Sequence, residues 1–295
     1  MSYLLTFYAI KIFIFFLNLL PFTASSFTAK MVGRIFHLLA GSRRLVALDN
    51  LNHAYKETLS PAQKKVIARK SFENTALSIL ELFLTRKIKK SAARRFSISG
   101  LENMENALSK GKGAILITSH LGSWEYLGFL FQLTGIQCSP IVKSIKNIYL
   151  DKEIDNLRRE MTLTPIPKKH AIRGTLTELK NNHVVAVLID QWDGKEGLWI
   201  DFFGTLTATT SLPARLARKT GCALVPAYCL RNGSGKYEIQ VLPQIPLPAN
   251  HEKGWETTVS QQLNKMLEIH IRQNPDQWSW AHKRWKNKPE TSRHT

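Results

Sequence analysis

The chain has 295 residues and a formal net charge of +19 at pH 7, which sets it apart from a near-neutral cytosolic enzyme. This length is enough to bury a full core and suits one large α/β domain or two small ones. Basic residues occur along the whole chain, so the molecule attracts polyanions such as nucleic acid, an anionic membrane surface or an acidic carrier protein. Its three cysteines have no metal-type spacing, and their odd number indicates reduced thiols in a cytosol-facing protein.

The N-terminal segment is strongly apolar. Residues 3–22 contain thirteen Leu, Ile or Phe and a single charge, at Lys11. No basic region precedes this run, which disfavours a signal peptide. We therefore expect a membrane anchor over residues 1–24 that either spans the bilayer or lies in its interface, with a buried core helix as the alternative. Each Lys or Arg of the body that lies near anionic lipid would add about 1 kcal/mol to membrane binding.

Periodic patterns after the anchor predict two helices and then an alternation of strands and helices. A basic amphipathic helix is expected over residues 29–48, and Ser60 followed by Pro61 is typical of the start of another helix. From Gly113 onward, strands are predicted at 114–118, 138–143, 164–167, 184–190, 223–230 and 237–242. Helices are predicted at 124–133, 148–161, 172–179, 212–219 and 255–271. Such alternation favours an α/β fold with a mostly parallel central sheet flanked by helices, in a single domain of residues 25–295.

His120 is the most informative residue because it directly follows the apolar run 113–119. Ligands of parallel sheets bind at the carboxyl ends of the strands, where both His120 and Asp190 fall. With Ser123 as the N-cap of the next helix and Glu125 in its first turn, the imidazole can fold back onto the Glu125 carboxylate. This arrangement is typical of a general base with its orienting acid. The spacing alone is weak evidence, since about 0.7 pairs of a His followed five positions later by Asp or Glu are expected by chance in this composition. The alternative is a histidine that merely packs at a strand end.

Seven blocks of the chain, in order and over nearly its whole length, resemble the bacterial lipid A biosynthesis acyltransferase family of lauroyl and myristoyl transferases. They are Arg44–Leu51, Phe72–Asn74 with Glu81–Phe83, His120–Glu125, Leu188–Gln191, Phe202–Gly204, Leu212–Gly221 and Pro275–His282. The resemblance implies transfer of an acyl group from acyl carrier protein to a hydroxyl of a lipid A precursor, at the cytoplasmic face of the bacterial inner membrane. The sequence holds no recognisable metal cluster or nucleotide-binding glycine loop, so neither a metal nor a cofactor is expected.

The chemistry of such a transfer fits these residues. A lipid hydroxyl is a poor nucleophile near neutral pH and needs a base as it attacks a thioester. In this interpretation His120 takes the proton, while Glu125 fixes the ring tautomer and stabilises the imidazolium. The acyl group passes directly to the acceptor, so no acyl-enzyme forms. Backbone amides at the start of the helix after His120 are expected to stabilise the oxyanion.

Four further residues are expected to bind substrate. Arg158 matches a basic residue that the family carries before the third strand, and the adjacent Arg159 fits instead if the register slips by one. Asp190 matches the family's strand-end acid, with a capping or turn role as the alternative. Arg173 lies near a predicted strand end, where it is placed to meet a sugar phosphate of lipid A. Packing, or a place at the bilayer interface, is expected of the three C-terminal tryptophans, Trp278, Trp280 and Trp285.

The acceptor and the class of protein each have an alternative. Gln191 follows Asp190 where several lipid A enzymes have His, and the Gln form also occurs in wider lysophospholipid and glycolipid acyltransferase relatives. A lysophospholipid, an aminolipid or another membrane glycolipid is therefore the alternative acceptor. The net charge alone would also fit a nucleic-acid-binding protein, but the anchor and the lack of a recognised binding motif argue against it. A catalytically inactive membrane scaffold is disfavoured because both His120 and Glu125 are present.

Overall fold

The computed structural model describes residues 2–194, 196–233, 235–248 and 253–286. Within these residues, seven strands form one central sheet in the order β1-β9-β8-β2-β5-β3-β4. Five neighbouring strands run parallel, namely β8 (Ala223–Arg231), β2 (Ala114–Thr118), β5 (Val184–Leu188), β3 (Cys138–Val142) and β4 (Ile166–Pro167). Strand β9 (Tyr237–Val241) is antiparallel to β8 and parallel to the short edge strand β1 (Phe96–Ser99). The predicted α/β fold with a mostly parallel central sheet is confirmed.

Both faces of the sheet are buried, because successive side chains of a strand point to opposite faces. In β2, Ala114 and Leu116 belong to one hydrophobic core, and Ile115 and Ile117 belong to the other. The first core is completed by α7 (Leu101–Leu108), α8 (Gly128–Thr134) and α9 (Ile148–Glu160), and the second by α10 (Ala171–Lys180), α11 (Leu212–Thr220) and α12 (Trp255–Gln273). Strands buried on both faces give continuous apolar runs, which explains why the predicted strands begin and end within two residues of the observed ones.

The N-terminal region forms three helices where the anchor and one further helix were expected. Helices α1 (Ser2–Leu19) and α2 (Phe22–Leu39) are separated at Pro21, and α3 (Gly41–Tyr55) follows a break at Ala40. The prediction of a single helix over residues 29–48 is wrong, because the backbone of Ala40 leaves helical geometry at φ −87° and ψ 65°. Helix α1 is apolar and long enough to cross a membrane, with a mean hydropathy of 1.7 and 6% of its 18 residues buried. It is the candidate membrane anchor.

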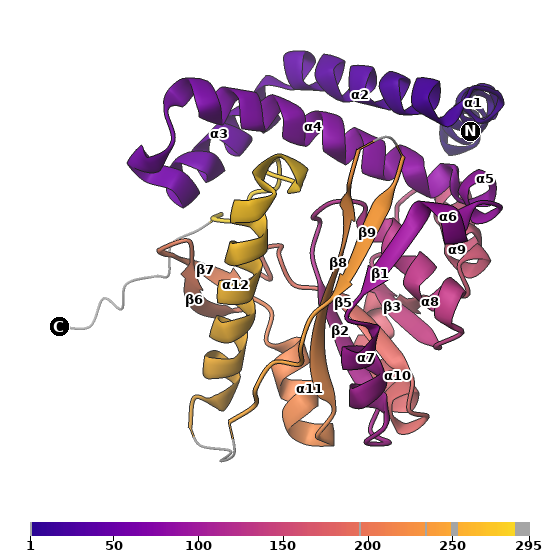
Figure 1. Cartoon of the computed structure of the whole chain (residues 1–295). Coiled ribbons are helices and arrows are strands. Elements are labelled where there is room, and N and C mark those ends of the chain that lie inside the picture. The colour runs from indigo at the N-terminus through magenta and orange to yellow at the C-terminus, as the bar shows by residue number, and fades with distance from the viewer. Residues whose placement is uncertain (1, 195, 234, 249–252, 287–295) are drawn as a thin grey trace.

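Helix α2 lies along α4 (Pro61–Phe83), on the side of the molecule that the β8–β9 turn approaches (Figure 1). The start of α4 is as predicted: the Ser60 hydroxyl accepts from the Gln63 amide, and the Gln63 side chain accepts from the Ser60 amide. The two helices approach closely at Gly33, where a Cβ would lie 2.5 Å from the backbone oxygen of Phe72. Two short helices, α5 (Thr85–Lys89) and α6 (Ala92–Arg95), connect α4 to β1.

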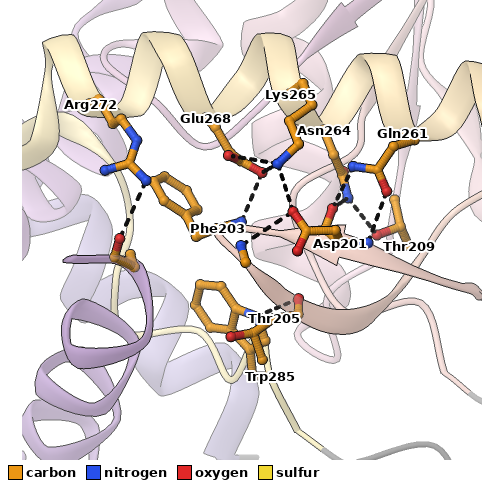
Figure 2. Close-up of polar contacts among 12 residues, drawn as sticks. Asp201, Phe203, Thr205, Thr209, Gln261, Asn264, Lys265, Glu268, Arg272 and Trp285 are labelled. Carbon is orange, nitrogen blue, oxygen red and sulfur yellow. Dashed lines mark hydrogen bonds and ion pairs between the residues drawn. The ribbon is translucent and has the colours of Figure 1, made fainter. Parts of the chain in front are cut away.

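A two-stranded antiparallel hairpin, β6 (Leu198–Phe202) and β7 (Thr205–Thr209), lies outside the central sheet against α12. The Gln261 side chain accepts from the backbone amide of Asp201 at 2.9 Å and donates to its carbonyl at 3.0 Å. Glu268 accepts from the amide of Phe203 at 2.8 Å, so one helix face satisfies the polar edge of the hairpin (Figure 2). The sequence prediction contained neither this hairpin nor β1.

Candidate active site

His120 and Asp190 meet at the carboxyl ends of two neighbouring strands. The β2–β5 pair ends with Thr118 opposite Leu188, and His120 and Asp190 each follow two positions after these residues. The Asp190 carboxylate accepts from His120 Nδ1 at 2.9 Å through Oδ1 and from the His120 backbone amide at 3.0 Å through Oδ2. Asp190 is therefore the acid that orients the imidazole. The prediction that Glu125 fixes the ring tautomer is wrong.

A third donor to Asp190 is the indole of Trp278, whose Nε1 lies 2.9 Å from Oδ2. Asp190 and Trp278 are almost fully buried, whereas the side chain of His120 is 24% exposed and so accessible to a substrate. The expected packing of Trp278 is confirmed, but its contact with the site was not foreseen. The signal in the sequence was the block Pro275–His282, which carried part of the resemblance without an assigned role.

The charges of this pair stabilise each other. Burial works against the charge of Asp190, but His120 and Trp278 overcome this effect and lower the pKa of Asp190 to about 2. Burial also favours the neutral form of His120, yet the charge and hydrogen bond of Asp190, with a further contribution from the charge of Glu125, raise the pKa of His120. With a raised pKa, the ring is a stronger base than a free histidine. The other ring nitrogen, Nε2, lies 3.4 Å from the side-chain amide nitrogen of Gln191.

Glu125 forms its ion pair with Arg158. The Nη2 and Nε atoms of Arg158 lie 2.7 and 3.1 Å from the two carboxylate oxygens of Glu125, which is a bidentate geometry. Burial disfavours the guanidinium charge, but Glu125 and Asp155 overcome this effect and raise the pKa of Arg158. Arg159 is exposed and contacts Asn156 at 3.4 Å. Of the two neighbouring arginines, Arg158 is the one that reaches Glu125.

The turn after His120 differs from the predicted helix start. The Ser123 hydroxyl donates to Oε2 of Glu81 at 2.7 Å and does not cap the next helix, which begins as the 3₁₀ segment η2 (Trp124–Leu127). Ser123 therefore occupies the N-cap position as predicted, but its side chain makes no capping hydrogen bond. A helical pattern in the sequence could not reveal the buried carboxylate of Glu81 as a competing partner, because that residue belongs to α4.

Two backbone amides of this turn are already used. The amides of Gly122 and Ser123 donate to the carbonyls of Gln277 and Cys229, at 3.0 and 2.8 Å. They are not free to stabilise an oxyanion. The next two amides, of Trp124 and Glu125, precede the first hydrogen bond of η2 and remain the candidates for that task.

The loop that carries Asp190 and Gln191 is fixed by Arg284. This residue is fully buried and donates to the carbonyls of Gln191 and Ala208 at 3.0 and 2.9 Å, and to the hydroxyl of Thr209 at 2.6 Å. Burial lowers the pKa of Arg284 to about 10, although the charge of Asp190 opposes the shift. Arg284 thus joins the β6–β7 hairpin to the loop beside His120.

Arg173 lies on α10, outside the contacts described above, and is exposed. The cavity that it lines has a volume of about 630 Å³ and is strongly basic, with Lys168, Lys169, His170 and Lys180 among the other lining residues. Lys168 pairs with Asp193 at 3.6 Å, so this basic face adjoins the loop after Asp190. The contact of Arg173 with a sugar phosphate stays a prediction.

Comparison with known proteins identifies a family and several relatives that match most of the chain. A family model described as bacterial lipid A biosynthesis acyltransferase matches residues 1–287. A lipid A biosynthesis palmitoleoyltransferase of Escherichia coli (strain K12) is 24% identical over 279 residues, which cover 92% of this chain and 87% of that protein. The lipid A biosynthesis lauroyltransferase of the same strain is 27% identical over 259 residues, which cover 84% of this chain and 80% of that protein.

A phosphatidylinositol mannoside acyltransferase of Mycobacterium tuberculosis is also similar. It is 29% identical over 193 residues, 64% of this chain, and the matched region spans 59% of that relative's own length. Proteins named for two different acceptors thus resemble this chain. The family match extends over nearly the whole sequence, and the chain belongs to the bacterial lipid A biosynthesis acyltransferase family. The resemblance inferred from the seven blocks is confirmed.

Proposed function

We propose that this chain is an O-acyltransferase that moves a fatty acyl group from acyl carrier protein to a hydroxyl of a lipid A precursor, with His120 as the general base. The observation that carries the proposal is the hydrogen bond between Asp190 and His120, which commits Nδ1 and leaves Nε2 as the proton acceptor. The acceptor hydroxyl takes the place of the Gln191 amide beside Nε2 and donates its hydrogen there.

The reaction balances without a protein nucleophile. The acceptor oxygen gives its proton to Nε2 and bonds to the thioester carbonyl carbon, after which the carbon–sulfur bond breaks and the imidazolium returns the proton to the departing thiolate. Asp190 stabilises the imidazolium between these two transfers. The amides of Trp124 and Glu125 donate to the oxyanion as it forms.

The Glu125–Arg158 pair acts on the acceptor in this proposal. Its bidentate geometry holds the Glu125 carboxylate in one orientation, and the charge of Glu125 is close enough to His120 to raise the pKa of the ring. A second polar group of the acceptor donates to Glu125 while the reacting hydroxyl meets the imidazole. Arg159 and Arg173, both exposed, are available to the phosphates of the lipid A precursor.

The proposed place of action is the cytoplasmic face of the bacterial inner membrane. Helix α1 supports membrane attachment by its length and its exposed apolar side chains. Buried free thiols at Cys138, Cys222 and Cys229 suit a reducing compartment. The net charge of +19 favours both anionic lipid headgroups and an acidic acyl carrier protein as partners.

A second candidate acceptor is another membrane glycolipid. The mycobacterial relative is named as a phosphatidylinositol mannoside acyltransferase, and it is 29% identical against 24% and 27% for the two lipid A enzymes. Gln191 beside His120 also departs from the histidine of several lipid A enzymes. The proposed base and the absence of an acyl-enzyme are the same for both acceptors.

Mass spectrometry of lipid A from a host that lacks its own late acyltransferase tests the first acceptor. One added acyl chain with the wild-type gene, and none with His120→Ala, would support the proposal. The purified protein is then offered acyl-acyl carrier protein with a lipid A precursor, a lysophospholipid or a mannosylated glycolipid. Transfer to the glycolipid alone would assign the second acceptor, and transfer to none of the three would refute the proposed reaction.

A further inference from the structure

A buried ion pair lies directly beneath the turn that carries His120. Glu81, near the C-terminal end of α4, is 1% exposed, and its two carboxylate oxygens accept from Nε and Nη2 of Arg231 at 3.0 and 2.7 Å. Arg231 is the last residue of β8. Burying such a pair costs free energy unless further hydrogen bonds complete it. The partners that complete this pair are therefore informative.

Two of the completing hydrogen bonds lead to the turn that carries His120. The Ser123 hydroxyl donates to Oε2 of Glu81 at 2.7 Å. The Ser78 hydroxyl, which Arg231 also contacts, donates to the carbonyl of Gly122 at 2.8 Å. Glu81 thus contacts Ser123 directly, and Arg231 reaches Gly122 through Ser78.

The opposite side of the turn is fixed by backbone contacts. The amides of Gly122 and Ser123 donate to the carbonyls of Gln277 and Cys229. Gly122 has a φ of +65°, and a Cβ there would lie 2.2 Å from the backbone oxygen of Cys229, so the turn approaches β8 as closely as glycine allows. Arg231 also binds Gln277, whose side chain accepts from the Arg231 amide at 3.1 Å. The turn is therefore held between two sets of contacts that share Arg231.

We propose that Glu81 and Arg231 are positioning residues for acyl transfer, which act through Ser123 and Ser78 on the turn that carries His120. The inference rests on the proposed function. The pair makes no hydrogen bond with the His120 ring, whose described partners are Asp190 and Gln191. It fixes the direction in which the turn presents Nε2 and the following amides to the acyl carbonyl. A displacement of about 1 Å in such groups lowers a rate by on the order of 10²-fold.

A matched pair of substitutions separates positioning from general stability. Ser123→Ala removes the hydroxyl that joins Glu81 to the turn. Tyr237→Phe removes another hydroxyl from the same carboxylate, since the Tyr237 hydroxyl donates to Oε1 of Glu81 at 2.9 Å from strand β9. Both variants keep the Glu81–Arg231 pair, so they remove equivalent contacts from Glu81 and differ in whether the turn is released.

The assay uses the full-length protein with lauroyl-acyl carrier protein and a lipid A precursor. We expect Ser123→Ala to lower kcat by about 10- to 100-fold, with KM for both substrates unchanged within about twofold. The acid limb of its pH–rate profile should lie at the same pH as in the wild type. Tyr237→Phe should keep kcat within about threefold of the wild type, with a similar loss of thermal stability in the two variants. An unchanged pH limb shows that the base keeps its pKa and has lost its alignment.

Each outcome decides between named alternatives. If the wild type is active and Ser123→Ala has the same kcat as the wild type, the positioning role is overturned and the proposed function is left intact. An equal loss of kcat in Ser123→Ala and Tyr237→Phe assigns the network to stability and also overturns the inference. Ser78→Ala, which frees the Gly122 carbonyl, gives the same test if Ser123→Ala does not fold: a lowered kcat supports the inference and an unchanged kcat overturns it. No transfer by the wild type would instead refute the proposed function.

Discussion

Asp190→Asn removes one charge from the site and keeps the shape of the side chain. The carboxylate faces three donors: Nδ1 and the backbone amide of His120, and the indole of Trp278. An asparagine that keeps its oxygen on the two donors at Oδ2 turns its amino group toward Nδ1. The imidazole then has to carry its proton on Nε2, which leaves no lone pair there for the acceptor hydroxyl.

The size of the effect follows from the coupling between the two groups. The pKa of Asp190 is lowered from 3.8 to about 2, so its charged form is favoured by roughly 2 to 3 kcal/mol in the folded site. Loss of that interaction in the transition state corresponds to on the order of 10²-fold in rate. The unfavourable tautomer adds to this loss, and the same substitution in a Ser-His-Asp triad costs about 10⁴-fold in kcat. We therefore expect Asp190→Asn to lower kcat by about 10² to 10⁴-fold.

The pH dependence gives a second, independent reading. Only the neutral ring accepts a proton, so the acid limb of kcat/KM rises through the pKa of His120. Asp190 raises that pKa, and Asp190→Asn should move the acid limb to lower pH while the plateau falls. Steady-state assays with acyl-acyl carrier protein from about pH 5 to 9 measure both. Asp193→Asn is the matched control, because Asp193 lies in the same loop and pairs with Lys168. A plateau within about tenfold of the wild type, or an acid limb at higher pH, would contradict the assigned role.

Three further predictions concern the base, the neighbouring arginines and the anchor. His120→Ala should abolish acyl transfer and leave unchanged the fraction of the protein that sediments with membranes. Turnover at the wild-type rate would show that His120 is not the base. Arg158→Gln should lower kcat by about tenfold or more, because the side chain of Glu125, which is only 16% exposed, loses the cation that pairs with it. Arg159→Gln should raise KM for the acceptor by at most about threefold, because Arg159 is exposed. Steady-state kinetics compare the two, and equal effects would count against the special position of Arg158. Deletion of residues 1–24 should release the protein from vesicles most clearly at high salt, where charge attraction is screened; a truncated chain that still sediments with vesicles would argue against α1 as the anchor.

The sequence predicts most clearly the central strands whose burial is continuous. Strand β2 is buried at all five positions, so its apolar run is visible without knowledge of its neighbours. Strand β1 (Phe96–Ser99) has four residues and only one buried side chain, which gives no such run. The β6–β7 hairpin depends on side chains of α12, such as Gln261, for its polar partners. Tertiary contacts of this kind are not encoded in a local pattern.

The sequence predicts the site residues whose place depends only on the strand directly before them. His120 was found because it follows β2, and Asp190 because it follows β5. Their pairing required the strand order, in which β2 and β5 are neighbours, and periodicity alone does not supply that order. Sequence proximity instead favoured Glu125, which lies five residues from His120 but pairs with Arg158. Trp278 was interpreted as packing, because nothing in its own segment indicates a carboxylate partner.

The order in which a ribosome makes the chain gives the C-terminal segment a particular significance. Trp278 donates to Asp190, the amide of Ser279 donates to the carbonyl of His120, and Arg284 donates to the carbonyl of Gln191. Helix α1 emerges from the ribosome long before any of these residues is synthesised. The apolar helix α1 is thus complete before the chain contains the segment that holds Asp190, His120 and Gln191 in place.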